Sequence, residues 1–413
     1  MKIAHIAPPW LAIPPKNYGG TEIVIYDLIE EQEAQGHDVT LFAPGDAKTS
    51  AKLISFFPRS LIEEGVPWAA HLKAYYHLQK AVECIKESDF DIVHTHLSSS
   101  GDMYIFPLTA PLVTPHVTTL HSRFPFDRVQ SWIGNADQDY IKEWGSSMPM
   151  IAISESARAE VLYDLNFVGV VHHGLPMKEF QPTGKKRGDF FVWLGRFAPE
   201  KGTHLAIDAA ERARVPIVLA GTIDRYSQES LRYFQEVIKP RIDNDQIKYV
   251  GPVNRKQKID LLSRAHGFLN PIEWEEPFGM VIIEAMALGC PVISFPRGAA
   301  PELIVHGETG FLVDNVKQIV RFMPKIDEID RDAIRMHVER NFSSHVMAEK
   351  YVKIYQKIIE MSKGRSAHAT TNGTTHKLLV TPASTIAKTA GPVQVPYQAA
   401  PVAKPVVEVE PER

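Results

Sequence analysis

The sequence predicts an α/β fold with two domains in tandem, and three observations support this. Short β-rich runs alternate with helical patterns in the first half of the chain, which is typical of βαβ units around a parallel sheet. The alternation begins again after a short polar stretch, "TGKKRGD" at residues 183–189. A length of 413 residues suits two domains that each bury a core of their own.

The first domain is expected over residues 1–180. Its strands are predicted from the runs "KIAHIAP", "HDVTLFA", "DIVHTHL", "VTTLHS" and "MIAIS". Between the first two, "TEIVIYDLIEEQEAQ" predicts an amphipathic helix that is opened by Thr21 and ended by Gly36.

The second domain is expected over residues 181–343. Its strands are predicted from "FFVWLGR", "PIVLAG", "IKYVG", "GFLNP" and "PVISF", with helices between them, one of which begins near Thr203. A cleft between two such domains is the expected ligand site.

The C-terminal region divides into a helix and a tail. Residues 344–362 have the pattern of an amphipathic helix, and we expect it to pack back on the first domain. From residue 364 to 413 the composition shifts to Ala, Thr, Pro, Val and Gly without periodicity, which predicts disorder.

Charge and composition exclude several classes of function. Residues 1–180 carry 13 Lys and Arg against 22 Asp and Glu, whereas a nucleic-acid partner would require a strongly basic face. The cysteines, Cys84 and Cys290, predict neither a disulfide framework nor a Cys-based metal site. No apolar run reaches the roughly 18 residues of a membrane span, and the N-terminus reads as a strand instead of a secretory signal. A cytoplasmic location is therefore expected.

Two glycine-containing motifs have the residue types that bind anions. In "YGGTE", Gly19 and Gly20 would let backbone amides approach a phosphate at a helix N-terminus, although a flexible loop would look the same. In "LGRFAPEKG", Arg196 and Lys201 follow a predicted strand, and a guanidinium and an ammonium together suit a diphosphate. By spacing alone they could also be solvated surface cations.

A third motif, "EEPFGMVIIEAM", places acids at both ends of an apolar helix. Pro277 is expected to set the first helical turn, so that the amides of Phe278, Gly279 and Met280 point outward together. Glu284 inside the helix is unfavourable unless it has a partner, because an unpaired buried acid is costly. A favourable interaction with the helix dipole is the alternative explanation.

Taken together and in this order, the motifs resemble the retaining family 4 glycosyltransferases of GT-B fold. The resemblance covers about residues 1–363 and rests on "YGGTE", "LGRFAPEKG", "NPIEWEEPFGMVIIEAMALGCPVI" and "PELIVHGETGFLV". It implies two Rossmann-like domains that face each other across a cleft. It also implies a hexosyltransferase that moves a sugar from a nucleotide diphosphate sugar to an acceptor hydroxyl. The expected donor is a UDP- or GDP-sugar. The acceptor would be a saccharide, a lipid-linked compound or a small molecule. No metal or other cofactor is implied.

Other functions share this architecture and stay open. Phosphorylases and nucleotide-sugar epimerases are built in the same way, and a catalytically silent nucleotide-sugar-binding subunit would keep the fold without the reaction.

The resemblance also implies a role for each candidate residue. Glu276 would accept hydrogen bonds from hydroxyls of the donor sugar, and Glu284 would hold the ribose. Arg196 and Lys201 would neutralise the departing diphosphate, and His121, at the end of "VTTLH", would lie beside the reacting carbon. The remaining donor-binding positions are backbone groups of the cradle and of the loop around the base: Gly19, Gly20, Gly251, Val253, Phe278, Gly279, Met280 and Val281.

Two patterns that suggest a metal are not taken as metal sites. His94 and His96 lie two apart on one strand, but no third ligand can be placed from the sequence. Asp243, Asn244 and Asp245 have the D-x-D spacing that binds Mn²⁺ in other transferases, yet they fall between a helix and a strand, where such residues form turns.

The acceptor is expected to be chosen by the loops around residues 50–77 and 123–140. The first of these is rich in aromatic residues, which suit a sugar or a lipid. A weak peripheral contact with the inner membrane face stays open, although the acidic balance of residues 1–180 is unfavourable for it.

Overall fold

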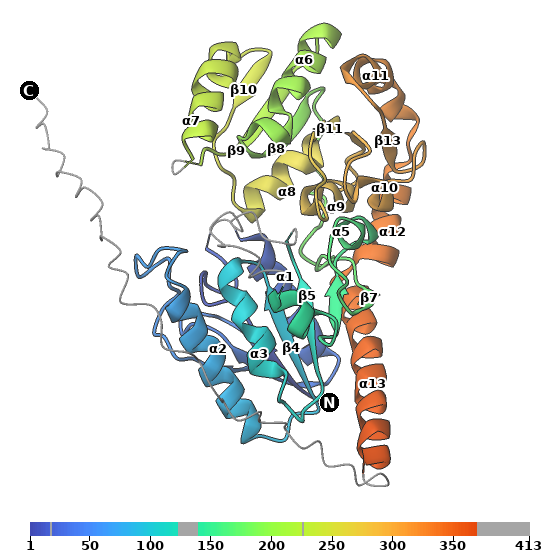
Figure 1. The fold of residues 1–413 in the computed structure, drawn as a ribbon. Helices are drawn as coiled ribbons and strands as arrows, with labels where there is room; N and C mark the ends of the chain where they lie inside the picture. Colours follow the sequence, from blue (N-terminus) through green and yellow to red (C-terminus); the bar gives the residue numbers. More distant parts are fainter. Residues whose placement is uncertain (17–18, 123–138, 225–226, 370–413) are drawn as a thin grey trace, which may run out of the picture. The chain divides into compact units, whose positions relative to one another are not determined.

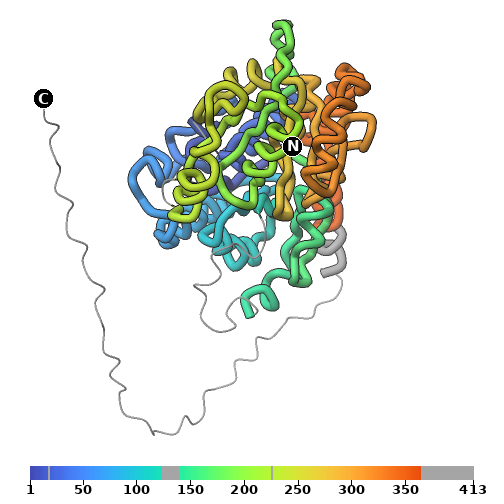
Figure 2. Tube along the Cα trace, turned by 90° about the horizontal axis from the view of Figure 1, so that it is seen from above, coloured from blue at the N-terminus to red at the C-terminus, as the bar shows by residue number. Residues whose placement is uncertain are grey.

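The computed structural model describes residues 1–16, 19–122, 139–224 and 227–369 (Figure 1, Figure 2). Residues through Ser366 form one compact unit. Most of the second acceptor loop, 123–138, and the predicted tail from residue 370 lie outside the described residues. The last described helix runs on to Ala369, so the first residues of the stretch expected to be disordered are helical.

The first half of the chain builds a seven-stranded parallel sheet of order β3-β2-β1-β4-β5-β6-β7. Its strands are β1 (Lys2–Ile6), β2 (Asp38–Phe42), β3 (Lys52–Ile54), β4 (Ile92–Leu97), β5 (His116–Leu120), β6 (Met150–Ala152) and β7 (Phe167–Val170).

The second half builds a six-stranded parallel sheet of order β10-β9-β8-β11-β12-β13. Its strands are β8 (Phe191–Arg196), β9 (Ile217–Thr222), β10 (Ile247–Tyr249), β11 (Gly267–Asn270), β12 (Val292–Ser294) and β13 (Gly310–Leu312). The predicted α/β fold of two Rossmann-like sheets is confirmed.

Both sheets change direction beside their first strand. From β1 the chain adds β2 and β3 on one side and β4 on the other, and from β8 it adds β9 and β10 before β11. In open parallel sheets, ligands bind outside the carboxyl ends of the strands at such a switch point. The residues that follow β1, β4, β8 and β11 are therefore the first place to look for a site.

Helices surround both sheets (Figure 1). In the first half these are α1 (Gly20–Ala34), α2 (His71–Lys86), η1 (Ser100–Tyr104), α3 (Ile105–Thr109), η3 (Ile141–Gly145) and α5 (Glu155–Ala159). In the second half they are η4 (Pro199–Lys201), α6 (Thr203–Ala213), α7 (Gln228–Tyr233), η5 (Phe234–Ile238), η6 (Lys239–Arg241), α8 (Arg255–Arg264), α9 (Met280–Ala287), α10 (Ala300–Leu303), α11 (Val316–Phe322), η7 (Met323–Glu328), α12 (Arg331–Phe342) and α13 (Ser344–Ala369). Among the described residues, no helix has the length and apolarity that crossing a membrane requires.

The two faces of the first sheet bury different layers. Ala4 of β1 belongs to the core beneath α2 and α3, and its neighbour Ile3 belongs to the core beneath α1 and α13. Successive residues of a strand point to opposite faces, so both faces are apolar and the strands read as nearly continuous hydrophobic runs.

Helix α13 packs on the first sheet. Its side chains Tyr351 and Tyr355 are fully buried in this contact. Their rings belong to the same core as Ile3 and Val117. The domain limits expected at residues 180 and 343 stay predictions.

Two helix starts differ from expectation. Helix α1 begins at Gly20 with Gly19 as its N-cap, so Thr21 lies inside the helix and does not cap it. Helix α9 begins at Met280, not at Pro277, because Gly279 adopts φ 97°, a left-handed conformation that redirects the chain before the helix. The first unpaired helix amides are consequently those of Met280 and Val281, and Phe278 and Gly279 precede the helix.

Candidate functional site

An ion pair lies at the switch point of the second sheet. Lys201, in the segment after β8, pairs with the Oε2 atom of Glu276, in the segment after β11. Trp274 Nε1 donates to the same oxygen at 3.1 Å, and its ring centroid lies 4.7 Å from Lys201 Nζ. A Cβ placed on Gly279 would be 3.8 Å from Glu276 Cγ, so the acid lies beside the N-terminus of α9. A cation, a carboxylate and helix amides thus meet at one place.

Two glycines allow the backbone to bring this pair together. Gly202 has φ 66°, and a Cβ there would lie 1.9 Å from the carbonyl oxygen of Pro271. Gly298 has φ 56°, and a Cβ there would lie 2.1 Å from the carbonyl oxygen of Glu276. That oxygen accepts a hydrogen bond from Ala299 N at 3.0 Å. Neither position has room for a side chain.

Arg196 ends β8, the strand that precedes Lys201. Its side chain is 42% exposed, and its Nη1 lies 4.0 Å from Asp224 Oδ2. The guanidinium therefore lies at the predicted edge of the sheet, near Asp224, which follows strand β9.

Glu284 occupies the buried face of α9 with only half of its carboxylate satisfied. Its Oε1 pairs with Lys258 of α8, and its Oε2 is buried without a hydrogen-bond partner in the described ranges. The ion pair explains how an apolar helix tolerates the acid, because both charges are compensated. The unpaired oxygen is a feature that buried polar groups rarely show, and a ligand hydroxyl would satisfy it.

Asp27 of α1 is a second buried acid with an unpaired oxygen, Oδ2. Burial raises the pKa of Asp27 to about 8; Arg255 lowers it, and Glu179 and Glu284 raise it. Asp27 therefore lies within electrostatic range of Arg255 on α8 and of Glu284 on α9.

His121 follows β5 and is buried. Its Nε2 is 2.9 Å from Nδ1 of His96, and its own Nδ1 has no hydrogen-bond partner among the residues that the structure describes. Burial lowers the pKa of His121 to about 3, so the imidazole is neutral. Its ring stacks on His173 at 5.3 Å, and His173 meets Phe278 edge-on at 4.9 Å. His121 and the segment before α9 therefore belong to one cluster.

Gly19 and Gly20 lie at the N-terminus of α1. A Cβ on Gly19 would come within 2.7 Å of Pro15 Cβ and 2.8 Å of Glu22 Oε2, whereas no described atom lies within 4 Å of a Cβ placed on Gly20. Burial raises the pKa of Glu22 to about 7. Close packing therefore requires a glycine only at position 19. The predicted role of Gly20 in anion binding depends on the unobstructed space beside its backbone amide.

Gly251 and Val253 lie in the segment between β10 and α8. Gly251 has φ 77°, and its carbonyl accepts from Gly221 N at 3.0 Å. Val253 lines a pocket of about 830 Å³ together with Glu179 and Arg255. None of the residues predicted to be catalytic lines this pocket.

Several residues of this region were not predicted from the sequence, among them Lys258, Trp274, His173 and Asp27. Trp274 and His173 stand in the conspicuous strings "EWEEPFG" and "VHHG", where an aromatic or a doubled histidine next to glycine could have drawn notice. Lys258 and Asp27 lie in ordinary charged helices and carry no such signal.

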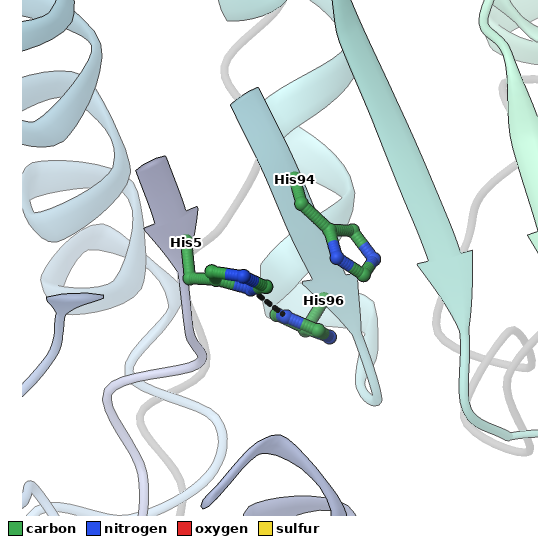
Figure 3. A group of neighbouring side chains, drawn as sticks. All are labelled: His5, His94 and His96. Atoms are coloured by element: carbon green, nitrogen blue, oxygen red, sulfur yellow. Dashed lines mark hydrogen bonds between the residues drawn. The ribbon is translucent and has the colours of Figure 1, made fainter. Parts of the chain in front are cut away.

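The two patterns that suggested a metal from the sequence both form hydrogen bonds within the protein. His5 supplies the third histidine that the sequence did not place, and ligand atoms of His5, His94 and His96 lie within 4.8 Å of one another (Figure 3). Asp243 Oδ1 accepts from the backbone amides of Asp245 at 2.9 Å and Ile247 at 2.8 Å, and these bonds lower the pKa of Asp243. The Asp243 carboxylate therefore stabilises the turn between η6 and β10, as the sequence predicted for these residues.

Comparison with known proteins identifies two matching family models. "Glycosyltransferase Family 4" matches residues 18–193, and "Glycosyl transferases group 1" matches residues 177–341.

Similar proteins match along most of their length. The phosphatidyl-myo-inositol mannosyltransferase of Mycobacterium leprae is 23% identical over 87% of this chain and 97% of its own. The sucrose-phosphate synthase of Thermosynechococcus elongatus superposes with a TM-score of 0.68 at 19% identity, over 87% of this chain and all of that one. The HepE protein of Anabaena, solved with UDP and glucose, gives a TM-score of 0.63 at 18% identity, over 86% and 98% of the two chains. At these identities the solved structures establish the fold.

Proposed function

We propose that this chain, which belongs to the family 4 glycosyltransferases of GT-B fold, transfers a hexosyl group from a nucleotide diphosphate sugar to an acceptor hydroxyl. Transfer retains the anomeric configuration and uses no metal. The observation that carries the proposal is the Lys201–Glu276 pair beside the N-terminus of α9. A ligand with a sugar next to a diphosphate has both the hydroxyls and the anionic oxygens that this arrangement would bind.

The cations act on the leaving group. As the bond between the sugar carbon and the phosphate oxygen breaks, negative charge grows on the diphosphate. Lys201, Arg196 and the first amides of α9, those of Met280 and Val281, stabilise that charge most where it is greatest. Because Lys201 is already held by Glu276 and Trp274, little reorganisation is needed when the donor binds.

Glu276 orients the sugar. Its Oε2 is occupied by Lys201 and Trp274, which fixes the plane of the carboxylate. Its remaining acceptor capacity is then directed at hydroxyls of the donor sugar, since an ionised carboxylate accepts several hydrogen bonds.

Glu284 holds the nucleoside. Its buried Oε2, which no described residue contacts by a hydrogen bond, would accept one from a ribose hydroxyl, while Lys258 keeps the other oxygen satisfied. The segment with Gly251 and Val253 frames the base through backbone groups.

The chemical step is attack on the same face from which the diphosphate leaves. The acceptor oxygen forms a bond to the sugar carbon as that carbon loses its phosphate oxygen, and the leaving phosphate oxygen takes the proton of the acceptor hydroxyl. A covalent glycosyl-enzyme trapped at an Asp or Glu would contradict this step.

The donor and the acceptor are proposed by class. UDP-sugars are the first donors to test, because HepE was solved with UDP and glucose. The acceptor is a saccharide or a lipid headgroup that meets the aromatic surface of α2 and η1. There Leu72 is 82% exposed, and Tyr75, Tyr76 and Tyr104 are also exposed.

A ligand screen tests the proposal. Binding raises the melting temperature by mass action, so at least one of a set of UDP-, GDP- and ADP-sugars should stabilise the protein. The stabilising sugar is then incubated with and without acceptors in the presence of EDTA, and the anomeric configuration of the product is read by NMR. Free epimer or sugar phosphate in place of a glycoside would indicate an epimerase or a phosphorylase, and an inverted product would contradict retention.

A further inference from the structure

A row of hydrogen-bonded side chains runs from α1 to the unpaired nitrogen of His121. Gln32 Oε1 lies 2.7 Å from Nε2 of His5, and Nδ1 of His5 lies 2.9 Å from Nε2 of His96. Nδ1 of His96 lies 2.9 Å from Nε2 of His121. All four side chains are buried, and Figure 3 shows the contact between His5 of β1 and His96 of β4.

The three imidazoles in the row are neutral. Burial lowers the pKa of His5 to about 4 and that of His121 to about 3, and it lowers the pKa of His96 well below its ordinary value. A neutral imidazole donates through one nitrogen and accepts through the other. One fixed proton therefore determines all the others.

Gln32 supplies that fixed point. Its Oε1 can only accept, so His5 carries its proton on Nε2 and accepts through Nδ1. His96 must then donate through Nε2 and accept through Nδ1, and His121 must donate through Nε2. The result is a bare, buried Nδ1 on His121 that can accept a hydrogen bond and receives none from the described part of the chain.

The orientation of the Gln32 amide is set from its other side. Its Nε2 donates to the hydroxyl of Tyr355 at 3.3 Å, and that hydroxyl gives its own proton to Nδ1 of His94 at 2.6 Å. His94 then donates through Nε2 to the hydroxyl of Thr119 at 2.7 Å. The donors and acceptors of this second row are all satisfied when the Gln32 amide oxygen faces His5 and its nitrogen faces Tyr355.

We propose that Gln32 is a positioning residue which, through His5 and His96, holds His121 in the tautomer with a bare Nδ1. On the proposed function, that nitrogen accepts a hydrogen bond from a hydroxyl of the bound donor sugar. His121 lies in the right surroundings, because it stacks on His173, which contacts Phe278 next to Glu276 and α9.

A metal in the His5, His94 and His96 cluster is the competing use of these side chains. All six of their ring nitrogens already have a polar partner, namely Gln32, Thr119, Tyr355, His121 or one another. A metal would have to break several of these buried bonds, so the hydrogen-bonded row accounts for the cluster better.

The tautomer can be measured without any ligand. Long-range ¹H–¹⁵N spectra of the whole chain with ¹⁵N-labelled imidazoles separate protonated from bare ring nitrogens, and the signals lost in His121→Phe identify His121. The expected result is a protonated Nε2 and a bare Nδ1. A protonated Nδ1 in the wild-type protein would overturn the proposal, and so would Zn²⁺-induced shifts of the histidine signals at equimolar metal.

Variants of α1 test the part played by Gln32. Gln32→Met removes the acceptor, so His121 should show both tautomers, whereas Gln32→Glu keeps an acceptor towards His5 and should keep one. Gln35→Met, at a half-buried glutamine just after the same helix, is the matched control. An unchanged single tautomer in Gln32→Met would refute the role of Gln32.

Binding measurements connect the tautomer to the donor sugar. Because Gln32→Met leaves only part of His121 in the tautomer with a bare Nδ1, its affinity for the nucleotide sugar should fall by the inverse of that fraction, about two- to tenfold, with unchanged affinity for the free nucleoside diphosphate. Equal weakening of both ligands would contradict the assignment to the sugar. If the wild-type protein binds no nucleotide sugar, the proposed function fails, and the tautomer measurement still decides the row of histidines.

Discussion

Lys201 contacts two groups that both attract its charge, the carboxylate of Glu276 and the face of Trp274. These two contacts fix the ammonium in η4, after β8, without a ligand. A cation that is already in place stabilises a developing diphosphate charge more effectively than one that must reorganise.

Removing this ammonium should affect turnover more than folding. Lys201→Ala is expected to lower kcat by about 10²–10³-fold, the usual effect of losing one fixed group that stabilises transition-state charge. Lys248→Ala, which removes an exposed lysine of β10, serves as the control and should leave kcat unchanged. Steady-state kinetics with the best donor measure both, and wild-type turnover in Lys201→Ala would rule out its role.

Substitution of Gly298 tests whether the close backbone packing between Gly298 and Glu276 is needed to position the acid. A methyl group there would overlap the main chain of Glu276, so Gly298→Ala should displace the acid and lower transfer more than tenfold, with a lower melting temperature. Gly307 also has a positive φ, 85°, but open space around it, so Gly307→Ala has only the backbone strain of about 1 kcal/mol. Equal losses of activity in the two variants would show that the overlap is unimportant.

At the scale of elements, α1 departs most from a simple amphipathic helix. Its inner face buries Glu22, Asp27 and Gln32 among aliphatic residues. Buried polar groups of this kind lower stability unless they are paired, and they are frequently retained for a functional reason.

This helix predicts a pH dependence of stability. The folded-state pKa of Asp27, about 8, lies above its unfolded value of 3.8, so the folded protein binds the proton more tightly. The associated stability is fully present below the unfolded pKa and is lost as pH rises towards 8. Asp27→Asn removes this loss and should raise the free energy of unfolding by roughly 1–3 kcal/mol at about pH 8.5, and by much less at about pH 5.

Urea unfolding of the wild-type protein and Asp27→Asn at both pH values measures the difference. Asp38→Asn, which changes an exposed carboxylate at the start of β2, controls for the loss of a charge. A stabilisation that does not depend on pH would contradict the raised pKa.

The strands were predictable because they are buried on both faces. "FFVWLGR" became β8 and "DIVHTHL" became β4, since central strands of parallel sheets read as apolar runs. The start of α9 was not predictable from the sequence. Pro277 favours a first helical turn, but the left-handed φ of Gly279 delays the start of the helix to Met280.

The site was predictable only where a motif carries it. Glu276 and Glu284 stand in a recognisable string, and so does Lys201. Lys258 pairs with Glu284 from a different helix, and His5 meets His96 through the register of β1 and β4. Contacts between distant segments depend on that register and on packing, which a single sequence does not display.

At the scale of the whole chain, several bonds join the two halves. Ser154, which caps α5, donates to the carbonyl of Pro277 at 2.6 Å. Glu302 of α10 accepts from His172 Nε2 and from the amides of Glu155 and Ser156 at 2.8–2.9 Å. The segment before α9 is therefore fixed against the first sheet, and we expect donor binding to depend on residues of both halves.

Calorimetric titration of the native protein with UDP-, GDP- and ADP-sugars and with the free diphosphates tests the central claim most directly. The account predicts saturable binding of at least one activated sugar, which Lys201→Ala weakens and Lys248→Ala does not. No binding of any of them, by a protein that still unfolds cooperatively, would contradict it.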